Sequence, residues 1–463
     1  MPSTLALTLT LRLFTGMQGP KEGCRVGRGE GDPNQWNQNL FFGNQPNLFR
    51  FGESNGVFIA FFERREQAVS NQNQYGALQP QEREYGLDWL RVCAFSLLIL
   101  YHSGMAYVSW PWTLKDTQHS QALEMVMLFL NRWRLPLIFL ISGAGVSFSL
   151  RRRSLQQFAG ERLRRLLVPF LFAMFVIIPP QHYVVWLTHG AQLSYAAFYP
   201  QLFRSVPHPH HMWFVAYILV FSLAGIPLFA LLRSDAGKRA LAALVRGLEH
   251  WPPLLYLLGI PAVCVGLFLE PHWPTTFTLI NDWANLCGGL IYFLLGFLIA
   301  SERRFLDLVT RRRVELLIVG LLFAAVHFGA IATGFTDGWP DGARALFWAG
   351  VGGIVVPTGF LTMGIVLAVL GFARAHVHRG GPWLTYANEA VDPFYIVHQT
   401  ITVAVVYAML PLAIGVWPKL AVAAGSTFIG SWLVFELVRR VRLLRPLFGL
   451  KARAPALGRP KMS

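Results

Sequence analysis

The sequence predicts an all-α, polytopic integral membrane protein with about ten transmembrane helices and with both termini in the cytoplasm. Of the 463 residues, 54% are hydrophobic and only 14% are charged, whereas a soluble protein carries about 25% charged residues. After residue 86, apolar segments recur, and each is close to the ~20 residues that cross a bilayer. Basic residues gather between alternate pairs of these segments, which is the pattern of a protein threaded through a membrane.

The first 80 residues differ from the rest. Residues 18–80 are rich in Asn, Gln and Gly, a composition that cannot bury a core, and we expect them to be disordered. We expect part of this N-terminal extension, residues 1–80, to come from a misassigned start; peptides from residues 1–60 in the mature protein would contradict this. A transmembrane domain is predicted over residues 83–450 and a basic cytoplasmic tail over residues 451–463.

Ten apolar segments make up the predicted transmembrane domain. Several contain Pro or Gly, which membrane-spanning helices tolerate because neighbouring groups satisfy the freed backbone. The predicted spans cover residues 87–107, 122–149, 166–188, 212–232, 252–269, 284–300, 314–333, 349–372, 391–412 and 418–438.

The connecting segments support this topology. Loops 150–165, 233–251, 301–313 and 373–390 and the C-terminal tail hold most of the Arg and Lys residues after residue 86, while each alternate loop holds at most one. Basic loops stay in the cytoplasm. The net charge of +16 is therefore explained by topology, and the expected surroundings are a lipid bilayer with no nucleic-acid partner.

The first span carries three ionisable side chains. His102 follows Arg91 by eleven residues, which is ~16 Å along a helix with only ~20° of residual rotation, so the two share a face. Asp88 lies one turn before Arg91 on the same side. Ionisable groups are costly in hydrocarbon and suggest function, although polar partners on neighbouring helices would explain them equally well. His102 could be a general base for a hydroxyl nucleophile, and Arg91 could hold an anion or Asp88.

Two further groups of arginines lie at the second and third spans. Arg132 and Arg134 in the second span face either the interior of the helix bundle or, if the span begins later, the membrane surface. Arg162 and Arg165 begin the third span. They could bind the phosphates of an anionic donor, or they could be ordinary positive-inside charge.

Histidines mark the fourth and ninth spans. His208, His210 and His211 precede the fourth span, but prolines interrupt them and no Cys or carboxylate is close in sequence, so we expect no metal site. Tyr395 and His398 share one helical face and are either core residues or part of a site. The four cysteines form no Cys-x-x-Cys pair, and no Walker A, H-E-x-x-H or G-x-S-x-G signature is present.

Six segments of the chain carry a family resemblance: REYGLDWLRVCAFSLLILYHS, RLPLIFLISGAG, RLRRLLVPF, HHMWFV, ANEAVDPFYIVHQTI and FELVRRVRLLRPLFGLK. Taken together, they resemble the membrane acyltransferase 3 family, which includes O-antigen and other polysaccharide O-acetylases. The first segment, with its spacing from Arg91 to His102, the His-x-Trp-Phe and the basic ending are most similar to the branch that succinylates periplasmic glucans.

The resemblance implies ten core helices, an acyl-CoA donor used from the cytoplasm, and an acceptor on the far side of the membrane or within it. The functional pair of the first helix falls on Arg91 and His102, and the donor-side R-x-x-R element falls on Arg162 and Arg165. Further residues match family positions that line the cavity: Arg134, His211, Trp213, Tyr395 and His398.

The expected function is therefore that of an inner-membrane O-acyltransferase which moves an acetyl or succinyl group from acyl-CoA to hydroxyls of an envelope glycan. His102 would be the base, Asp88 would orient Arg91, and Arg91 would contact the donor or stabilise the developing oxyanion. No bound cofactor or metal is expected. Three alternatives stay open: a transporter of an anionic or acylated solute, an acyltransferase for a lipid or small molecule, and a non-catalytic assembly partner.

Overall fold

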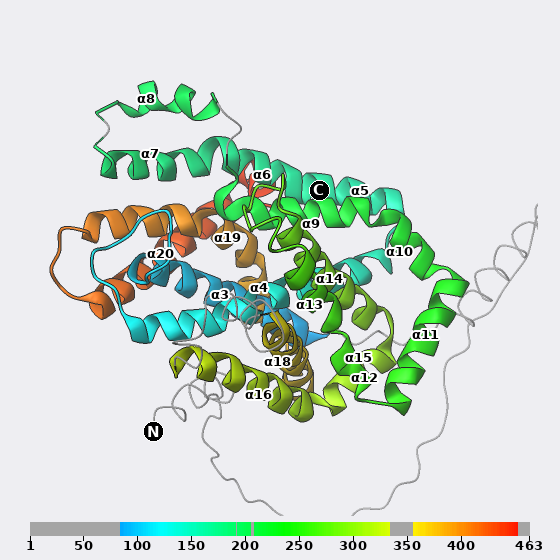
Figure 1. Cartoon of the computed structure of the whole chain (residues 1–463). Coiled ribbons are helices and arrows are strands. Elements are labelled where there is room, and N and C mark those ends of the chain that lie inside the picture. Colours follow the sequence, from blue (N-terminus) through cyan, green and yellow to red (C-terminus); the bar gives the residue numbers. More distant parts are fainter. Residues whose placement is uncertain (1–83, 191, 205–207, 334–354, 452–463) are drawn as a thin grey trace, which may run out of the picture. The chain divides into compact units, whose positions relative to one another are not determined.

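A computed structural model describes residues 84–190, 192–204, 208–333 and 355–451. Within these ranges the secondary structure is helical and contains no strand (Figure 1). The predicted extension over residues 1–80 and nearly all of the predicted tail lie outside the described residues.

The first half of the described chain, up to the amphipathic helix α11, contains nine α-helices of widely different length. The α-helices are α3 (Tyr85–Gly104), α4 (Gln121–Leu150), α5 (Leu155–Arg162), α6 (Val168–Phe172), α7 (Ile178–Thr188), α8 (Tyr195–Phe198), α9 (Trp213–Ala224), α10 (Ile226–Arg233) and α11 (Asp235–His250). Short 3₁₀ or π-helical turns extend or join them: η1 (Met105–Tyr107), η2 (Leu163–Leu167), η3 (Ala173–Ile177), η4 (Tyr199–Phe203) and η5 (His210–Met212).

The second half contains both long and short helices, among them the amphipathic helix α15. The helices are α12 (Leu254–Leu257), α13 (Ile260–Phe268), α14 (Trp283–Ser301), α15 (Arg303–Arg311), α16 (Arg313–Ala332), α18 (Val355–His376), α19 (Pro382–Met409), α20 (Val416–Arg440) and α21 (Leu444–Leu447).

Seven described helices are long and apolar enough to span a membrane, which makes this a multi-pass membrane protein. They are Tyr85–Tyr107, Gln121–Leu150, Leu155–Thr188, Trp283–Ser301, Arg313–Ala332, Thr358–His376 and Val416–Arg440. An eighth span would be the pair α9 and α10, which bends by 51° just before Pro227, a residue that lacks the N–H needed to continue a helix. Helices occupy most of each of the ten predicted segments as far as these are described; the number of ten spans and the cytoplasmic termini stay predictions.

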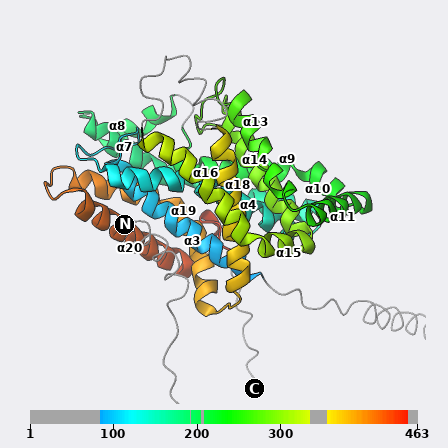
Figure 2. The same cartoon turned by 60° about the horizontal axis from the view of Figure 1, so that its bottom comes forward.

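Helix α3 lies among α4, α18, α19 and α20, with which it makes its main contacts (Figures 1 and 2). Helix α4 also packs against α14, and the backbones of these two helices come very close to each other. A Cβ on Gly143 would lie 1.8 Å from the carbonyl oxygen of Phe293, and one on Gly296 would lie 1.9 Å from that of Leu140. Small residues allow such approach in membranes, where packing holds helices together, so α14 fixes the helix against which α3 rests.

A proline in the middle of α4 is compensated by a neighbouring helix. Pro136 has no N–H, so the carbonyl of Arg132, one turn earlier, loses its helical donor. The hydroxyl of Thr362 on α18 donates to that carbonyl at 2.9 Å. Because hydrocarbon offers no water to replace the missing bond, this contact stabilises the turn that carries Arg134.

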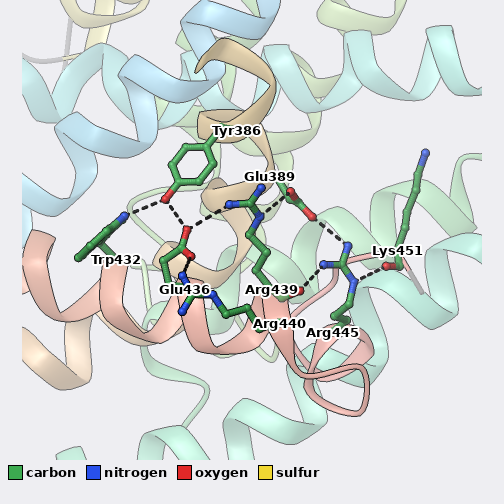
Figure 3. Close-up of polar contacts among 8 residues, drawn as sticks. All are labelled: Tyr386, Glu389, Trp432, Glu436, Arg439, Arg440, Arg445 and Lys451. Atoms are coloured by element: carbon green, nitrogen blue, oxygen red, sulfur yellow. Dashed lines mark hydrogen bonds and ion pairs between the residues drawn. The ribbon is translucent and has the colours of Figure 1, made fainter. Parts of the chain in front are cut away.

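The C-terminal segment, residues 441–451, is fastened below the first turns of α19 (Figure 3). The Arg445 guanidinium donates to a Glu389 carboxylate oxygen at 2.9 Å, to the Arg439 carbonyl at 3.0 Å and to the Lys451 carbonyl at 2.8 Å. Glu436 completes the network by accepting hydrogen bonds from the side chains of Tyr386, Arg439 and Arg440. The network therefore ties α19, α20 and the C-terminal segment together.

Candidate functional site

Helices α3 and α19 meet at two polar contacts. Near the start of α3, Arg91 donates to a carboxylate oxygen of Asp392 at 2.6 Å. Near its end, Nδ1 of His102 lies 2.7 Å from Nε2 of His398. The contacts come in the same order on both helices, so the helices run in the same direction. Along α3 the two contacts are ~16 Å apart.

The contact near the end of α3 belongs to a group that we call the histidine centre: the half-buried His102 and the buried Arg134, His211, Tyr395 and His398. The rings of His102 and His398 are stacked, with centroids 5.0 Å apart, and the ring of His211 lies edge-on to that of His398 at 5.2 Å. The hydroxyl of Tyr395 donates to the backbone carbonyl of His211. Three helical segments, α3, α9 with its preceding turn, and α19, are thereby joined at one point.

Arg134 is the buried cation of the histidine centre. Its residue is only 2% exposed, and its guanidinium carbon lies 3.6 Å above the centroid of the Tyr101 ring. Its charge acts on both His102 and His398. Within the described part of the chain, its Nε and Nη1 make no hydrogen bond. A buried guanidinium with unused donors is suited to receive an anionic group, because such donors are costly to leave unpaired.

The connection between α3 and α4 covers the His102 end of the histidine centre. Trp112 on this connection stacks on the His102 ring, with centroids 6.5 Å apart and planes within 14°. On the same connection, Asp116 accepts a hydrogen bond from Lys419 of α20 at 2.6 Å. The side chain of Asp116 is only 2% exposed and that of Lys419 only 1%. Removing one partner of a charge pair that is so well buried strongly destabilises the folded protein, because the other charge is left unpaired. The pair therefore holds the connection firmly over the histidine centre.

The contact near the start of α3 belongs to a second group, the arginine cluster: Arg91, Arg162, Arg165, Glu161 and Asp392. Arg165 lies 3.7 Å from Asp392 and 3.5 Å from Glu161, and its Nε donates to the Gly449 carbonyl at 3.3 Å. Arg162 lies over the Phe158 ring at 4.8 Å, and the charges of Arg91 and Arg165 both act on it. Three arginines beside two carboxylates leave a net positive cluster that an anion can enter.

The helical segment that carries these arginines is irregular. Between α5 and α6 the chain makes a π-helical turn, Leu163–Leu167, which includes Arg165. A π-helical turn inserts extra chain into an α-helix and often lies at a functional site. Here it turns Arg165 toward Asp392 and the C-terminal segment, whereas its neighbour Arg164 is exposed.

The structure separates the site residues predicted from the sequence into these two groups. His102, Arg134, His211, Tyr395 and His398 meet in the histidine centre, whereas Arg91, Arg162 and Arg165 meet in the arginine cluster. Asp88 lies in the first turn of α3. Among the described residues, the Trp213 ring contacts no histidine ring. It packs against the rings of Phe277, at 4.8 Å between centroids, and Tyr217, at 5.0 Å.

Sequence reasoning missed the role of Asp392. Its carboxylate joins Arg91 to Arg165, from helices far apart in the chain. The available signal was an acidic residue six positions before His398 in the same span, since such residues inside spans pair with other charges. Gly449 was also missed, because a backbone acceptor leaves no mark in a sequence.

Comparison with known proteins identifies the class. A family model described as an acyltransferase domain matches residues 84–436, which is more than half of the chain. The chain belongs to the acyltransferase 3 family, as its motifs predicted, and it is an acyltransferase.

Curated relatives point to one branch of this family. They include proteins named glucans biosynthesis protein C from Shigella dysenteriae serotype 1 (strain Sd197), Escherichia coli O81 (strain ED1a) and Escherichia coli (strain K12). Each is 22% identical to this chain over 385 residues, which cover 80% of this chain and 96% of the relative.

Proposed function

We propose that this protein is an O-acyltransferase of the inner membrane that transfers a small acyl group, acetyl or succinyl, from acyl-CoA to hydroxyls of an envelope glycan. The observation that carries the proposal is the placement of an arginine cluster and a histidine centre at the two ends of one helix in a member of an acyltransferase family. The printed name of the relatives concerns glucan biosynthesis and supports a glucan as the acceptor.

The arginine cluster fits the anionic end of the donor. Acyl-CoA has phosphates at one end and a thioester at the end of a long flexible arm. Arg91, Arg162 and Arg165 offer charged, partly exposed donors, and arginine pairs with phosphate oxygens through two parallel hydrogen bonds. The arm would then run along α3, which places the thioester near His102.

The histidine centre fits the reaction itself. His102 takes the proton from the acceptor hydroxyl as its oxygen forms a bond to the thioester carbon. The carbon–sulfur bond then breaks, and CoA leaves as a thiol after His102 returns the proton to its sulfur. The products are an ester of the glycan and free CoA, and no other reactant is consumed.

Arg134 is the residue best placed for the negative charge that develops on the carbonyl oxygen. It lies in the histidine centre, whereas Arg91 is ~16 Å away along α3 and is paired with Asp392. Prearranged donors in a water-free site stabilise such charge strongly. We therefore assign Arg134 to the oxyanion and Arg91 to the donor side, where Asp88 lies one turn before it.

The test is mass spectrometry of envelope glycans and lipids from a deletion strain that carries the wild-type gene, an empty vector, His102→Ala or His119→Ala. His119 is an exposed histidine on the connection between α3 and α4 and is the matched control. The wild type and the control are expected to add an acyl mass to a glycan, and the other two strains are not. The same increment in the empty-vector strain refutes the proposal, and an increment confined to lipids reassigns the acceptor.

A further inference from the structure

The hydrogen-bond partner of His398 fixes where its proton is. Nδ1 of His398 lies 2.7 Å from the backbone carbonyl oxygen of Tyr395. A carbonyl oxygen can only accept, so Nδ1 of His398 carries a hydrogen and donates it. In a neutral ring the other nitrogen, Nε2, is then an acceptor. We take both rings of the pair as neutral, since a charge within hydrocarbon is expensive.

The protonation of His398 determines which ring nitrogen of His102 carries the hydrogen. The acceptor Nε2 of His398 lies 2.7 Å from Nδ1 of His102, so Nδ1 of His102 is the donor of this bond. Its Nε2 then holds the lone pair. Within the described part of the chain, that nitrogen makes no hydrogen bond, because the contacts of the His102 side chain are the bond to His398 and the rings of Tyr101, Trp112 and His398.

The position of His398 is itself fixed by the surrounding backbone. His211 donates from Nε2 to the Ile396 carbonyl at 2.9 Å, and the Thr402 hydroxyl donates to the His398 carbonyl at 2.8 Å. Together with the hydroxyl bond of Tyr395 to His211, these contacts anchor the turn of α19 that carries His398. The ring is therefore a rigid acceptor for His102.

We infer that His398 is a positioning residue, which holds His102 in the tautomer whose Nε2 lone pair is free to take the acceptor proton. The role of His102 as base rests on the proposed function, whereas the tautomer rests on the hydrogen bonds alone. A second ring nitrogen replaces the carboxylate that orients the base in many hydrolases. A neutral partner suits this place in the membrane, where a carboxylate would bring a buried charge.

Two replacements of His398 separate positioning from packing. His398→Leu keeps a similar bulk and removes the acceptor, whereas the amide oxygen of His398→Gln can reach the place of Nε2. Acyl transfer from acyl-CoA to a purified glucan is measured with protein in nanodiscs. We expect the leucine variant to lose at least about tenfold in kcat, up to the ~10²–10⁴-fold that a general base contributes, with an unchanged KM for acyl-CoA. The glutamine variant is expected to keep a higher kcat than the leucine variant.

A second background shows whether the effect passes through His102. In His102→Ala, the additional change His398→Leu is expected to leave the residual rate unchanged, because the group that it positions is already gone. An exposed histidine, changed in His378→Leu, is the control for the loss of any histidine. Equal losses in the glutamine and leucine variants, or a further loss in the double variant, would overturn the inference.

The tautomer is measured without any activity. In protein labelled with ring-¹⁵N histidine, subtraction of the spectrum of His102→Ala identifies the nitrogens of His102. We expect Nδ1 of His102 to be protonated and its Nε2 to be unprotonated. We also expect a coupling across the hydrogen bond between Nδ1 of His102 and Nε2 of His398, and this coupling should be absent in His398→Gln. A protonated Nε2 on His102 overturns the inference even if the wild type is active. If the wild type transfers no acyl group, the proposed function fails, while this spectrum still decides the geometry of the pair.

Discussion

The histidine centre and the arginine cluster lie at the two ends of α3 and are built in opposite ways. The histidine centre is buried apart from the half-buried His102, and it is held by hydrogen bonds between uncharged groups and backbone carbonyls, with Arg134 as its charge. The arginine cluster is held by ion pairs, and the side chains of Arg91 and Asp392 are 36% and 34% exposed. On the proposed function, the difference corresponds to two tasks, proton transfer and donor capture, which need different surroundings in one protein.

Burial is useful where bonds are made, because fixed dipoles and charges act strongly when water is excluded. Exposure is useful where a charged donor must enter and leave. An ion pair that is one-third exposed is weakened by solvent and salt, so under the proposed function Asp392 would release its arginines to a phosphate at a small cost in free energy. The comparison predicts that changes in the histidine centre alter kcat, whereas changes in the arginine cluster alter KM for the donor.

The largest effect is expected for His102→Ala. Loss of the proposed base should lower kcat by ~10²–10⁴-fold and leave KM for acyl-CoA nearly unchanged, since the proposed donor site lies ~16 Å away along α3. Steady-state kinetics in nanodiscs measure both constants, and His119→Ala should match the wild type. A change in KM alone would break the comparison.

The next effect concerns the connection between α3 and α4, which covers the histidine centre. Lys419→Met leaves the Asp116 carboxylate buried without its charge partner, and we expect the free energy of unfolding to fall by about 3–5 kcal/mol. Denaturant unfolding in detergent, followed by tryptophan fluorescence, measures this. Lys238→Met is the control, because the side chains of Lys238 and Asp235 are 68% and 87% exposed and such a pair contributes at most about 1 kcal/mol.

The double variant Lys419→Met with Asp116→Asn sharpens this prediction. It removes both charges, and it should recover part of the stability lost in the single variant. If Lys238→Met and Lys419→Met prove equally mild, the connection between α3 and α4 is not held as the structure indicates.

A smaller effect is expected at the arginine cluster. Arg165→Ala removes a charged donor that is only partly buried, and KM for acyl-CoA should rise by up to about tenfold, with kcat retained. The control is Arg164→Ala, on the same helical turn but exposed, which should leave KM unchanged. Equal effects of the two substitutions would mean that general positive charge, and not this cluster, attracts the donor.

The smallest effect is the response to salt. Because charges at the arginine cluster are partly exposed, we expect KM for acyl-CoA to rise a few-fold as the Debye length falls from ~10 Å at 0.1 M to ~3 Å at 1 M salt. In the same titration kcat should stay constant. A salt-dependent kcat at saturating donor would show that the histidine centre is more open to water than its burial indicates.

The sequence predicts the helical class, the approximate position of each helix and the key residues of α3, because hydropathy and helical periodicity are local properties. It also indicates which side chains share a face, as for Arg91 and His102. It does not indicate the partner across that face. Asp392 and His398 follow those residues by about 300 positions, and nothing in one sequence states that α19 packs on α3.

Arg134 illustrates the same limit. The sequence left it either inside the bundle or reaching toward the membrane surface. The choice depends on where Thr362 of α18 and Tyr101 of α3 lie, because these contacts fix the turn and cover the guanidinium. Long-range packing decides such cases, and local patterns do not contain it.

The bond from Arg165 to the Gly449 carbonyl has a consequence for the making of the protein. The two residues are 284 positions apart, and the segment that presents Gly449 is fastened by Arg445 and Glu389 at the end of the domain (Figure 3). A chain still on the ribosome has α3 and Arg165 in the membrane long before Gly449 exists. The arginine cluster therefore reaches its full set of contacts only after nearly the whole chain has been synthesised, and a chain truncated before Gly449 lacks the carbonyl that holds Arg165.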